Sequence, residues 1–282
     1  MALQIFNNIS SINARRVLSS NNNVLGQTLG RVASGIRVQK SSDDGGALSL
    51  SVSLRSDTRA LQQAENNTND GQSLVSTAEG GLNEISTITV RLKELAQQAA
   101  TGTIGNSERQ TLQLEFKQLT NEIDRIANST EFNGQNLLNG DLSAAATNQV
   151  FIQIGTDSST DSRFNLNQRL NIDAVNASQL GLDTVNISTQ SGAVAAVDTV
   201  TAAVDQISKT RASVAAVQLQ IGHAISNLSV AVENMTQAES TVRDADLGQE
   251  LTKLTKQALL VQSGTAMVSQ ANLNPQAALL LL

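Results

Sequence analysis

The sequence predicts a mainly α-helical protein: a long antiparallel helical bundle or coiled coil with a small β-hairpin tip and paired N- and C-terminal helices. Three observations support this. Apolar residues recur at alternating steps of three and four over several long stretches, only 2% of the 282 residues are aromatic, and the chain has one proline. Cores without aromatic rings are usually built from aliphatic side chains on helices. Proline interrupts helices and is common in loops, so a chain with one proline favours long helices.

The first element is a helix over about 40 residues. Its apolar positions follow four-three steps, with polar Asn22 in one place of the series, where asparagine can fix the register of a coiled coil. The helix ends at Asp43-Asp44 and Gly45-Gly46, residues that suit a cap or a junction. The predicted seam comprises Ile5, Ile9, Ile12, Leu18, Leu25, Leu29, Val32 and Ile36.

Two further helices repeat the same period. After a more polar stretch at 48–67, the rhythm returns in a helix that stops near 101–105, and Ser107 with Gln110 resembles a capping box that starts the next helix. The first of these helices carries Val75, Ala78, Leu82, Ile85, Thr89, Leu92, Ala96 and Ala99, and the second carries Leu112, Phe116, Leu119, Ile123 and Ile126.

The pattern changes after Ala127. Asn133-Gly134 and Asn139-Gly140 are turn signals, and the segment 149–155 reads as a short strand that pairs with 163–170. Residues 141–192 contain the only β-structure that the sequence predicts. They form the predicted tip.

The longest seam runs from Ala193 to about Gln237. A spacing sustained over this length favours partner helices wound around it in a left-handed sense, and the helix would be roughly 60 Å long. Arg211 and Gln218 are its only polar interruptions. The members are Val197, Val200, Val204, Ile207, Arg211, Val214, Gln218, Ile221, Ile225, Leu228, Val232 and Met235.

A polar, acidic junction at 239–246 precedes the last helix, which is expected to end near Asn274-Pro275. Two terminal helices pressed together leave much apolar surface in water, and such surface usually marks an interaction site. The chain is therefore expected to assemble with copies of itself. The predicted seam of the last helix comprises Leu247, Leu251, Leu254, Ala258, Val261, Thr265, Val268 and Asn272.

These elements predict three domains. Residues 1–45 and 240–282 form a terminal coiled-coil domain, residues 46–140 and 193–239 form the helical bundle, and residues 141–192 form the variable tip.

No pattern of residues supports catalysis, a metal or a cofactor. His223 is the only histidine, cysteine is absent, and the GxxxxG spacing at Gly30–Gly35 lacks the Lys and Ser/Thr of a phosphate loop. Asp43-Asp44 and the pair Asp244 and Asp246 are interpreted as helix caps. The net charge of −6 argues against nucleic acid or an anionic membrane as partner. The chain is therefore not expected to be an enzyme.

The first ten residues lack the basic segment and apolar run of a secretory signal, and the longest apolar run, 277–282, is too short to span a membrane. A cleaved signal or a membrane anchor is therefore not expected.

Several motifs in the correct order resemble the bacterial flagellins, the subunits of the flagellar filament. The chain departs from the usual pattern at Gly45-Gly46-Ala47, where the family more often has Ala-Ala-Gly, and its variable region is minimal. The matching motifs are ISSINARR (9–16), RVASGIRV (31–38), SSDDGGAL (41–48), EFNGQNLLNG (131–140), VRDAD (242–246) and GTAMVSQAN (264–272), followed by Pro275-Gln276.

The resemblance implies a structural protein that polymerises into an extracellular filament and drives swimming motility. The terminal domain would line the inner tube, the bundle would form the outer tube, and the tip would face outward. The implied partners are other copies of the chain, an export chaperone at the C-terminal helix, and the filament cap and junction proteins. Export would use the type III channel of the flagellum, without a cleaved signal.

The resemblance also implies recognition by the flagellin-sensing Toll-like receptor, an innate immune receptor, through Arg91, Leu95 and Glu115. Judged from the residues alone, Leu95 belongs to the core and the two charged side chains lie on a solvated helix face. The alternative function is a soluble binding module with the same helical frame, such as a hook-filament junction protein or a secreted helical adhesin.

Overall fold

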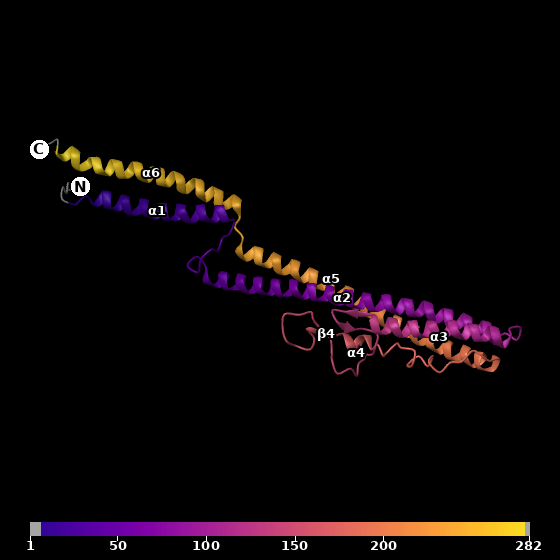
Figure 1. The fold of residues 1–282 in the computed structure, drawn as a ribbon. Coiled ribbons are helices and arrows are strands. Elements are labelled where there is room, and N and C mark those ends of the chain that lie inside the picture. Colours follow the sequence, from indigo (N-terminus) through magenta and orange to yellow (C-terminus); the bar gives the residue numbers. More distant parts are fainter. Residues whose placement is uncertain (1–6, 280–282) are drawn as a thin grey trace. The chain divides into compact units, whose positions relative to one another are not determined.

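The computed structural model describes residues 7–279, and the side chains of residues 7–273. Its elements follow the order predicted for a helical protein with a small β-structure (Figure 1). They are α1 (Ile9–Ser34), α2 (Gly45–Ala100), α3 (Asn106–Ser129), β1 (Glu131–Phe132), β2 (Gln135–Asn136), β3 (Phe151–Gln153), β4 (Arg163–Asn165), α4 (Leu166–Leu170), α5 (Gln190–Arg243) and α6 (Leu247–Leu279).

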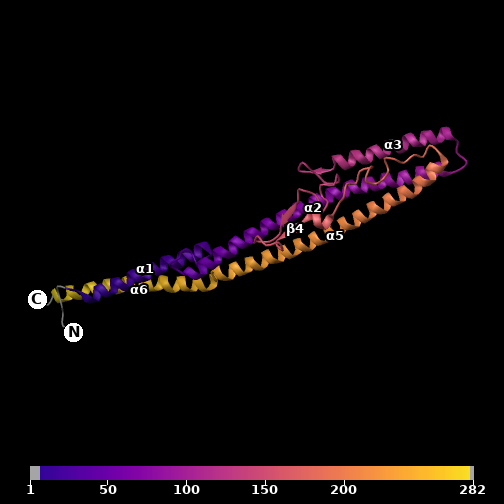
Figure 2. The same ribbon diagram turned by 90° about the horizontal axis from the view of Figure 1, so that it is seen from below.

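The chain divides into two compact units. The first contains Met1–Ser56 and Asn234–Leu282, and the second contains Asp57–Glu233. Helices α2 and α5 each contribute to both units. In the first unit α1 and α6 lie side by side and antiparallel, as both ribbon views show (Figures 1 and 2).

The core of the second unit lies where α2, α3 and α5 pack together. Every residue of the predicted apolar row on α2, from Val75 to Ala99, is buried, and Thr89 within it bonds the Ile85 carbonyl with its hydroxyl. Phe116 and Ile123 of α3 are also buried. The predicted period of these helices is therefore confirmed.

One row of the predicted seam on α5 is confirmed as buried, whereas the other lies at the edge of the core, where Val197 and Ile225 are partly buried. The heptad row Val200, Ile207, Val214, Ile221 and Leu228 is buried as expected. The second buried row, however, consists of Ala196, Ala203 and Val217, each one position before the predicted residue. Small alanines let helices approach closely, whereas the sequence pattern favours the larger valines beside them.

Because the second buried row of α5 is shifted by one residue, charged Arg211 is not in the core. Arg211 lies at the edge of the contact between helices, where its Nε and Nη2 both donate to Glu79 Oε1 of α2, at 3.0 and 2.8 Å. The sequence counts Arg211 as an interruption of the seam. In the structure it joins α5 to α2.

The tip packs on the bundle and shares its core. Its buried residues, among them Leu142, Ile152 and Phe164, belong to the same apolar cluster as the residues of α2, α3 and α5. A Cβ atom added at Gly71 of α2 would collide with the Ile152 side chain, so the close approach of the tip requires glycine there. The segment between α4 and α5 runs along α3 (Figure 1), where Gln113 and Asp124 bond its backbone amides at Ile187 and Ala177.

Two antiparallel strand pairs form the β-structure. β1 and β2 make a hairpin whose turn residues Asn133 and Gly134 have φ of 50° and 77°, so the turn predicted from Asn-Gly is confirmed. The prediction that β-structure is confined to 141–192 is wrong, because this turn brings the two-residue strands on either side of it into register. β3 pairs with β4, with Ile152 opposite Phe164. The predicted strand at 163–170 is too long, because Asn165 caps the short helix α4 by accepting a bond from Gln168 N.

Three predicted helix ends are also wrong. The first helix, α1, ends at Ser34 and not at Asp43-Asp44, because Gly35 adopts a left-handed conformation with a φ of 70° that ends the helix. α3 begins at Asn106, and its N-cap is Gly105 without a side-chain bond, so Ser107 is not the cap. α6 continues past Pro275 to Leu279. Proline has no N–H for the carbonyl four residues earlier, and that carbonyl, of Ala271, accepts instead a hydrogen bond from Asn8 Nδ2 of α1 at 2.7 Å.

Candidate assembly surface

The face where α1 meets α6 is unusually polar for a pair of helices. Its least exposed positions recur at heptad spacing on both helices. They are Ser11, Ala14, Leu18, Asn21, Leu25, Thr28 and Val32 on α1, and Glu250, Leu254, Gln257, Val261, Gly264, Val268 and Ala271 on α6.

Hydrogen bonds fix the register of this pair. Ser11 Oγ donates to Asn272 Oδ1 at 2.6 Å, and Gln257 Nε2 donates to Asn21 Oδ1 at 3.3 Å. Leu18 packs against Gly264, where a Cβ atom would lie 3.1 Å from Leu18 Cδ1. Long-range polar bonds and one close approach thus align the two helices over their shared length.

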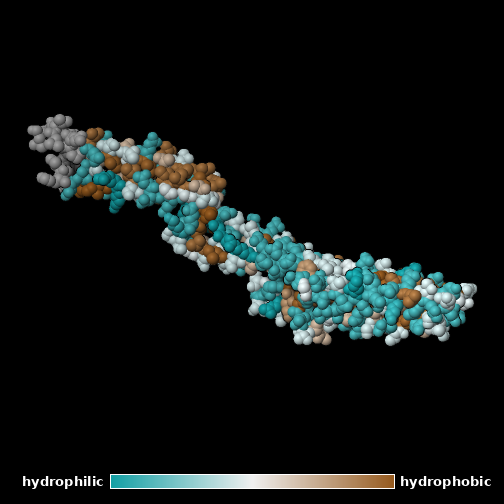
Figure 3. Space-filling view, viewed as in Figure 1, coloured by the Kyte–Doolittle hydropathy of each residue, from teal (hydrophilic) through white to brown (hydrophobic). Residues whose placement is uncertain are grey.

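Many other large apolar side chains of α1 and α6 are exposed rather than packed in this contact face. Ile12 is 60% exposed, Leu259 62% and Met267 61%. The space-filling view shows this apolar surface gathered over α1 and α6 (Figure 3). Contiguous apolar surface of this kind marks an interaction site. Its members are Ile9, Ile12, Val17, Val24 and Leu29 of α1, and Leu247, Leu251, Leu259, Leu260, Met267 and Leu273 of α6; we call these residues the outward apolar surface.

The residues of the predicted assembly seam lie on two different faces. Leu25, Val32, Leu254, Val261 and Val268 are half-buried on the contact face of the pair. The second set, Ile9, Ile12, Leu29, Leu247 and Leu251, belongs to the outward apolar surface.

Two members of that seam lie on neither face. Ile36 follows α1 and forms an isolated antiparallel bridge with Asp244, and Ile5 lies outside the described residues. The step of six between Ile12 and Leu18 breaks the four-three rhythm. The heptad positions of Leu25 and Val32 therefore fall on the contact face, whereas Ile9, Ile12 and Leu29 do not.

A short β-bridge joins the two junction segments of the first unit. Arg37 N donates to Arg243 O at 2.8 Å, and Ala245 N donates to Gly35 O at 2.9 Å. Gly35 ends α1 with a φ of 70°, a conformation that glycine adopts without strain. The sequence predicts both junctions as caps but carries no signal that they pair, because a bridge of one residue pair has no periodicity.

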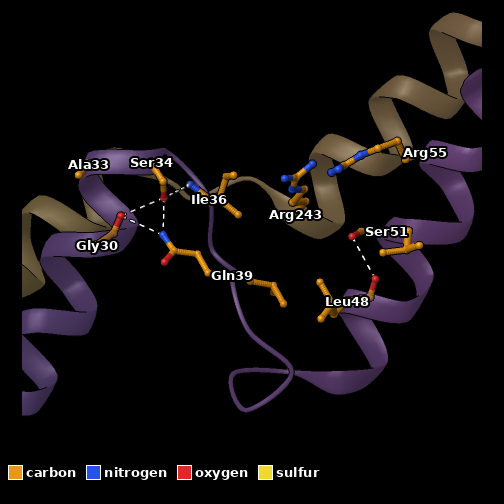
Figure 4. Close-up of a pocket in the computed structure, with 11 residues that line it drawn as sticks. Gly30, Ala33, Ser34, Ile36, Gln39, Leu48, Ser51, Arg55 and Arg243 are labelled. Atoms are coloured by element: carbon orange, nitrogen blue, oxygen red, sulfur yellow. Dashed lines mark hydrogen bonds between the residues drawn. The ribbon is translucent and has the colours of Figure 1, made fainter.

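A cavity of about 440 Å³ opens beside this bridge. Figure 4 shows the end of α1 and the following segment on one side, and the first turns of α2 with the end of α5 on the other. Arg55 Nη2 and Arg243 Nη1 both donate to Glu239 Oε1, at 2.8 and 3.1 Å, so one carboxylate holds two guanidinium groups at the wall.

The three residues predicted to meet the immune receptor lie together in the second unit. Arg91 Nη2 of α2 donates to Glu115 Oε1 of α3 at 2.8 Å, and Arg91 Nη1 donates to Glu94 Oε2 at 3.0 Å. The hydrogen bond to Glu115, with a smaller contribution from Glu94, raises the pKa of Arg91 above its ordinary value. Leu95 is fully buried in the core. The exposed part of this site is therefore the ion pair.

The residues considered for catalysis, phosphate binding or metal binding lie in helices or at helix ends. His223 is exposed on α5, and Gly30 and Gly35 lie at the end of α1. Asp44 Oδ1 accepts a bond from Ala47 N and caps α2. Across residues 7–279, no three His, Cys, Asp or Glu side chains gather as metal ligands would. No helix in that range is long and apolar enough to cross a bilayer.

Comparisons with known proteins agree along the whole chain. A family model described as the bacterial flagellin N-terminal helical region matches residues 5–143, and one described as the bacterial flagellin C-terminal helical region matches residues 197–282. The flagellin of Bacillus subtilis (strain 168) is 37% identical over 99% of this chain and 100% of its own length. Flagellin FlaB2 of Treponema pallidum (strain Nichols) is 34% identical over 99% of both chains.

One solved structure is also similar. The crystal structure of Bacillus cereus flagellin aligns with a TM-score of 0.49 and 27% identity, covering 62% of this chain and 94% of that one.

Proposed function

This chain belongs to the bacterial flagellin family and is a structural subunit of the extracellular flagellar filament. We propose that copies of it assemble through the outward apolar surface of α1 and α6. The observation that carries the proposal is the direction of the side chains. The contact face of the pair includes polar residues such as Asn21 and Gln257 beside its half-buried leucines and valines, while further leucines and isoleucines are exposed to water.

A helix pair in an isolated soluble protein normally buries its apolar stripe. Fully covering one leucine side chain is worth about 1.5–3 kcal/mol, so covering the outward apolar surface with neighbouring copies supplies the driving force for polymerisation. In this proposal the terminal helices form the inner tube of the filament, the bundle forms the outer tube, and the tip at 141–192 faces outward. The proposal also includes export through the type III channel of the flagellum, with a chaperone that covers α6 before assembly.

Electron microscopy of the purified chain tests this proposal. We expect the intact chain, seeded or salted out, to form long tubes, and a chain without residues 1–40 and 245–282 to form none. Circular dichroism of the trimmed chain must still show a cooperative helical transition, so that loss of assembly is separated from loss of folding. Tubes from the trimmed chain would refute the proposal.

We further propose that the pair Arg91 and Glu115 contacts the flagellin-sensing Toll-like receptor. The pair is exposed, bridges α2 and α3, and is about half accessible on each side chain. A receptor-reporter assay should lose signal with Arg91→Ala and with Glu115→Ala. Arg125→Ala is the matched control, because Arg125 forms a similar exposed ion pair with Glu122 on α3. Equal responses from all three variants would contradict the proposal.

A further inference from the structure

We propose that the cavity beside the junction bridge binds the leucine-rich segment at residues 279–282 of a second copy of this chain. The inference rests on the proposed function, because the contact joins subunits of a filament. It adds a specific end-to-end contact to the lateral covering of α1 and α6.

The lining of the cavity favours an apolar occupant. Ala33 and Ile36 lie on one side and Leu48 and Val52 on the other, with Val38 buried between them. Val52 is 58% exposed in the single chain. A cavity of this volume is in the range that protein pockets offer to small apolar groups.

The polar groups of the wall are already bonded within the chain. Gln39 Nε2 donates to the Gly30 carbonyl at 2.9 Å and also bonds Ser34 Oγ, and Ser51 Oγ donates to the Leu48 carbonyl. Arg55 and Arg243 share Glu239. An aliphatic side chain can therefore enter the cavity without breaking these bonds and displaces only water.

The sequence supplies a matching apolar group. Residues 279–282 are four consecutive leucines, preceded by Ala277 and Ala278, and no charge lies among them. They follow α6 at the end where Ala271 and Asn272 bond the first residues of α1.

The geometry assigns this segment to another copy. α6 begins at Leu247, four residues after Arg243 in the cavity wall, and its 33 residues span about 50 Å. Within one chain the end of α6 at Leu279 and the cavity therefore lie at opposite ends of the same helix pair. A contact between unlike ends of identical subunits is heterologous, and such contacts generate open helical assemblies.

Disulfide cross-linking tests the contact, since the wild-type chain has no cysteine. One variant carries Ala33→Cys at the cavity and another carries Leu281→Cys. The two are copolymerised with an excess of wild-type chains and then oxidised. We expect cross-linked dimers that contain one copy of each variant, because disulfides form only when the two Cα atoms approach within about 7 Å.

The matched control replaces Ala33→Cys with Ser20→Cys, which is an exposed position near the middle of α1. We expect dimer formation with Leu281→Cys to be at least tenfold lower at Ser20 than at Ala33. Equal yields at both positions, or filaments without any mixed dimer, would overturn the inference while leaving the proposed function intact. Failure of the wild-type chain itself to form filaments would overturn both.

Discussion

Arg109 of α3 is a buried charged residue that caps the C-terminal end of α2. It is 5% exposed and donates to the Ala99 and Thr101 carbonyls at 2.7 and 2.9 Å, and to Asn106 Oδ1 at 3.1 Å. The last carbonyls of a helix lack intrahelical partners and carry partial negative charge. The guanidinium therefore caps α2 and orders the turn into α3.

We predict that Arg109→Ala destabilises the second unit by about 2–4 kcal/mol, since hydrogen bonds from charged groups are worth about 1.5–3 kcal/mol each and the carbonyls lose their donor. Urea unfolding followed by circular dichroism measures the change. Arg125→Ala, which removes an exposed pair on the same helix, should cost under about 1 kcal/mol. Similar losses from both variants would show that the cap has no special role.

Gly80 and Gly81 are neighbours in α2 with different surroundings. A Cβ atom at Gly80 would meet nothing within 4 Å, whereas one at Gly81 would lie 2.7 Å from Leu138 Cδ1 and 2.8 Å from Thr130 Oγ1. Thr130 Oγ1 in turn donates to the Ile126 carbonyl. Gly81 therefore makes room for the start of the tip.

We predict opposite effects of alanine at these two positions. Gly80→Ala should stabilise the helix by about 0.5–1 kcal/mol, because alanine has the higher helix propensity. Gly81→Ala should destabilise by about 1 kcal/mol or more, because the added methyl group displaces Leu138 and Thr130. Thermal unfolding compares the two variants, and equal stabilisation by both would mean that the tip does not press on α2.

The register of α5 decides which of its aliphatic residues matter for stability. Ile221 is 1% exposed against the core, whereas Leu219, two residues earlier, is 67% exposed. Both are large apolar side chains of the same helix. Only the buried row packs against α2, so residue type alone does not rank them.

We predict that Ile221→Ala costs about 2–5 kcal/mol, the range for removing a buried aliphatic side chain. Leu219→Ala should change the free energy of unfolding by under about 0.5 kcal/mol. Chemical denaturation of the two variants measures the difference. A larger loss at Leu219 would place the contact face of α5 on its other side.

At the scale of the whole molecule, folding and assembly use different surfaces. The cores of the bundle and tip are continuous and buried, whereas the outward apolar surface of α1 and α6 contributes little to the single chain. Substitutions on that surface should therefore separate the two properties.

We predict that Leu259→Gln leaves thermal unfolding of the monomer within about 0.5 kcal/mol of wild type. The concentration needed for polymerisation should rise about tenfold, since losing one buried leucine at a subunit contact costs at least about 1.4 kcal/mol. Sedimentation of filaments against total protein measures this threshold. An unchanged threshold would remove Leu259 from the assembly surface, and Lys256→Gln, an exposed polar change on the same helix, is the control.

The sequence by itself determined the helical class, the order of the helices, the buried row of α2, the Asn-Gly turn and the pairing of β3 with β4. These features follow from local rules: a period of three and four residues in a helix, positive φ in a tight turn, and alternation in a strand. The buried position of Leu95 and the exposure of Arg91 and Glu115 follow from the same helical period, whereas the ion pair between these two residues depends on how α2 packs against α3.

Only the tertiary structure decided which apolar residues face inward. The buried row of α5 contains Ala196 rather than the adjacent Val197, because the neighbouring helix packs closely enough to favour the smaller side chain. Asn8 donates to the Ala271 carbonyl that Pro275 leaves without an intrahelical partner, although 263 positions separate Asn8 from Ala271. The bridge between Ile36 and Asp244, the cap by Arg109 and the outward apolar surface likewise depend on contacts between distant segments, which no local period encodes.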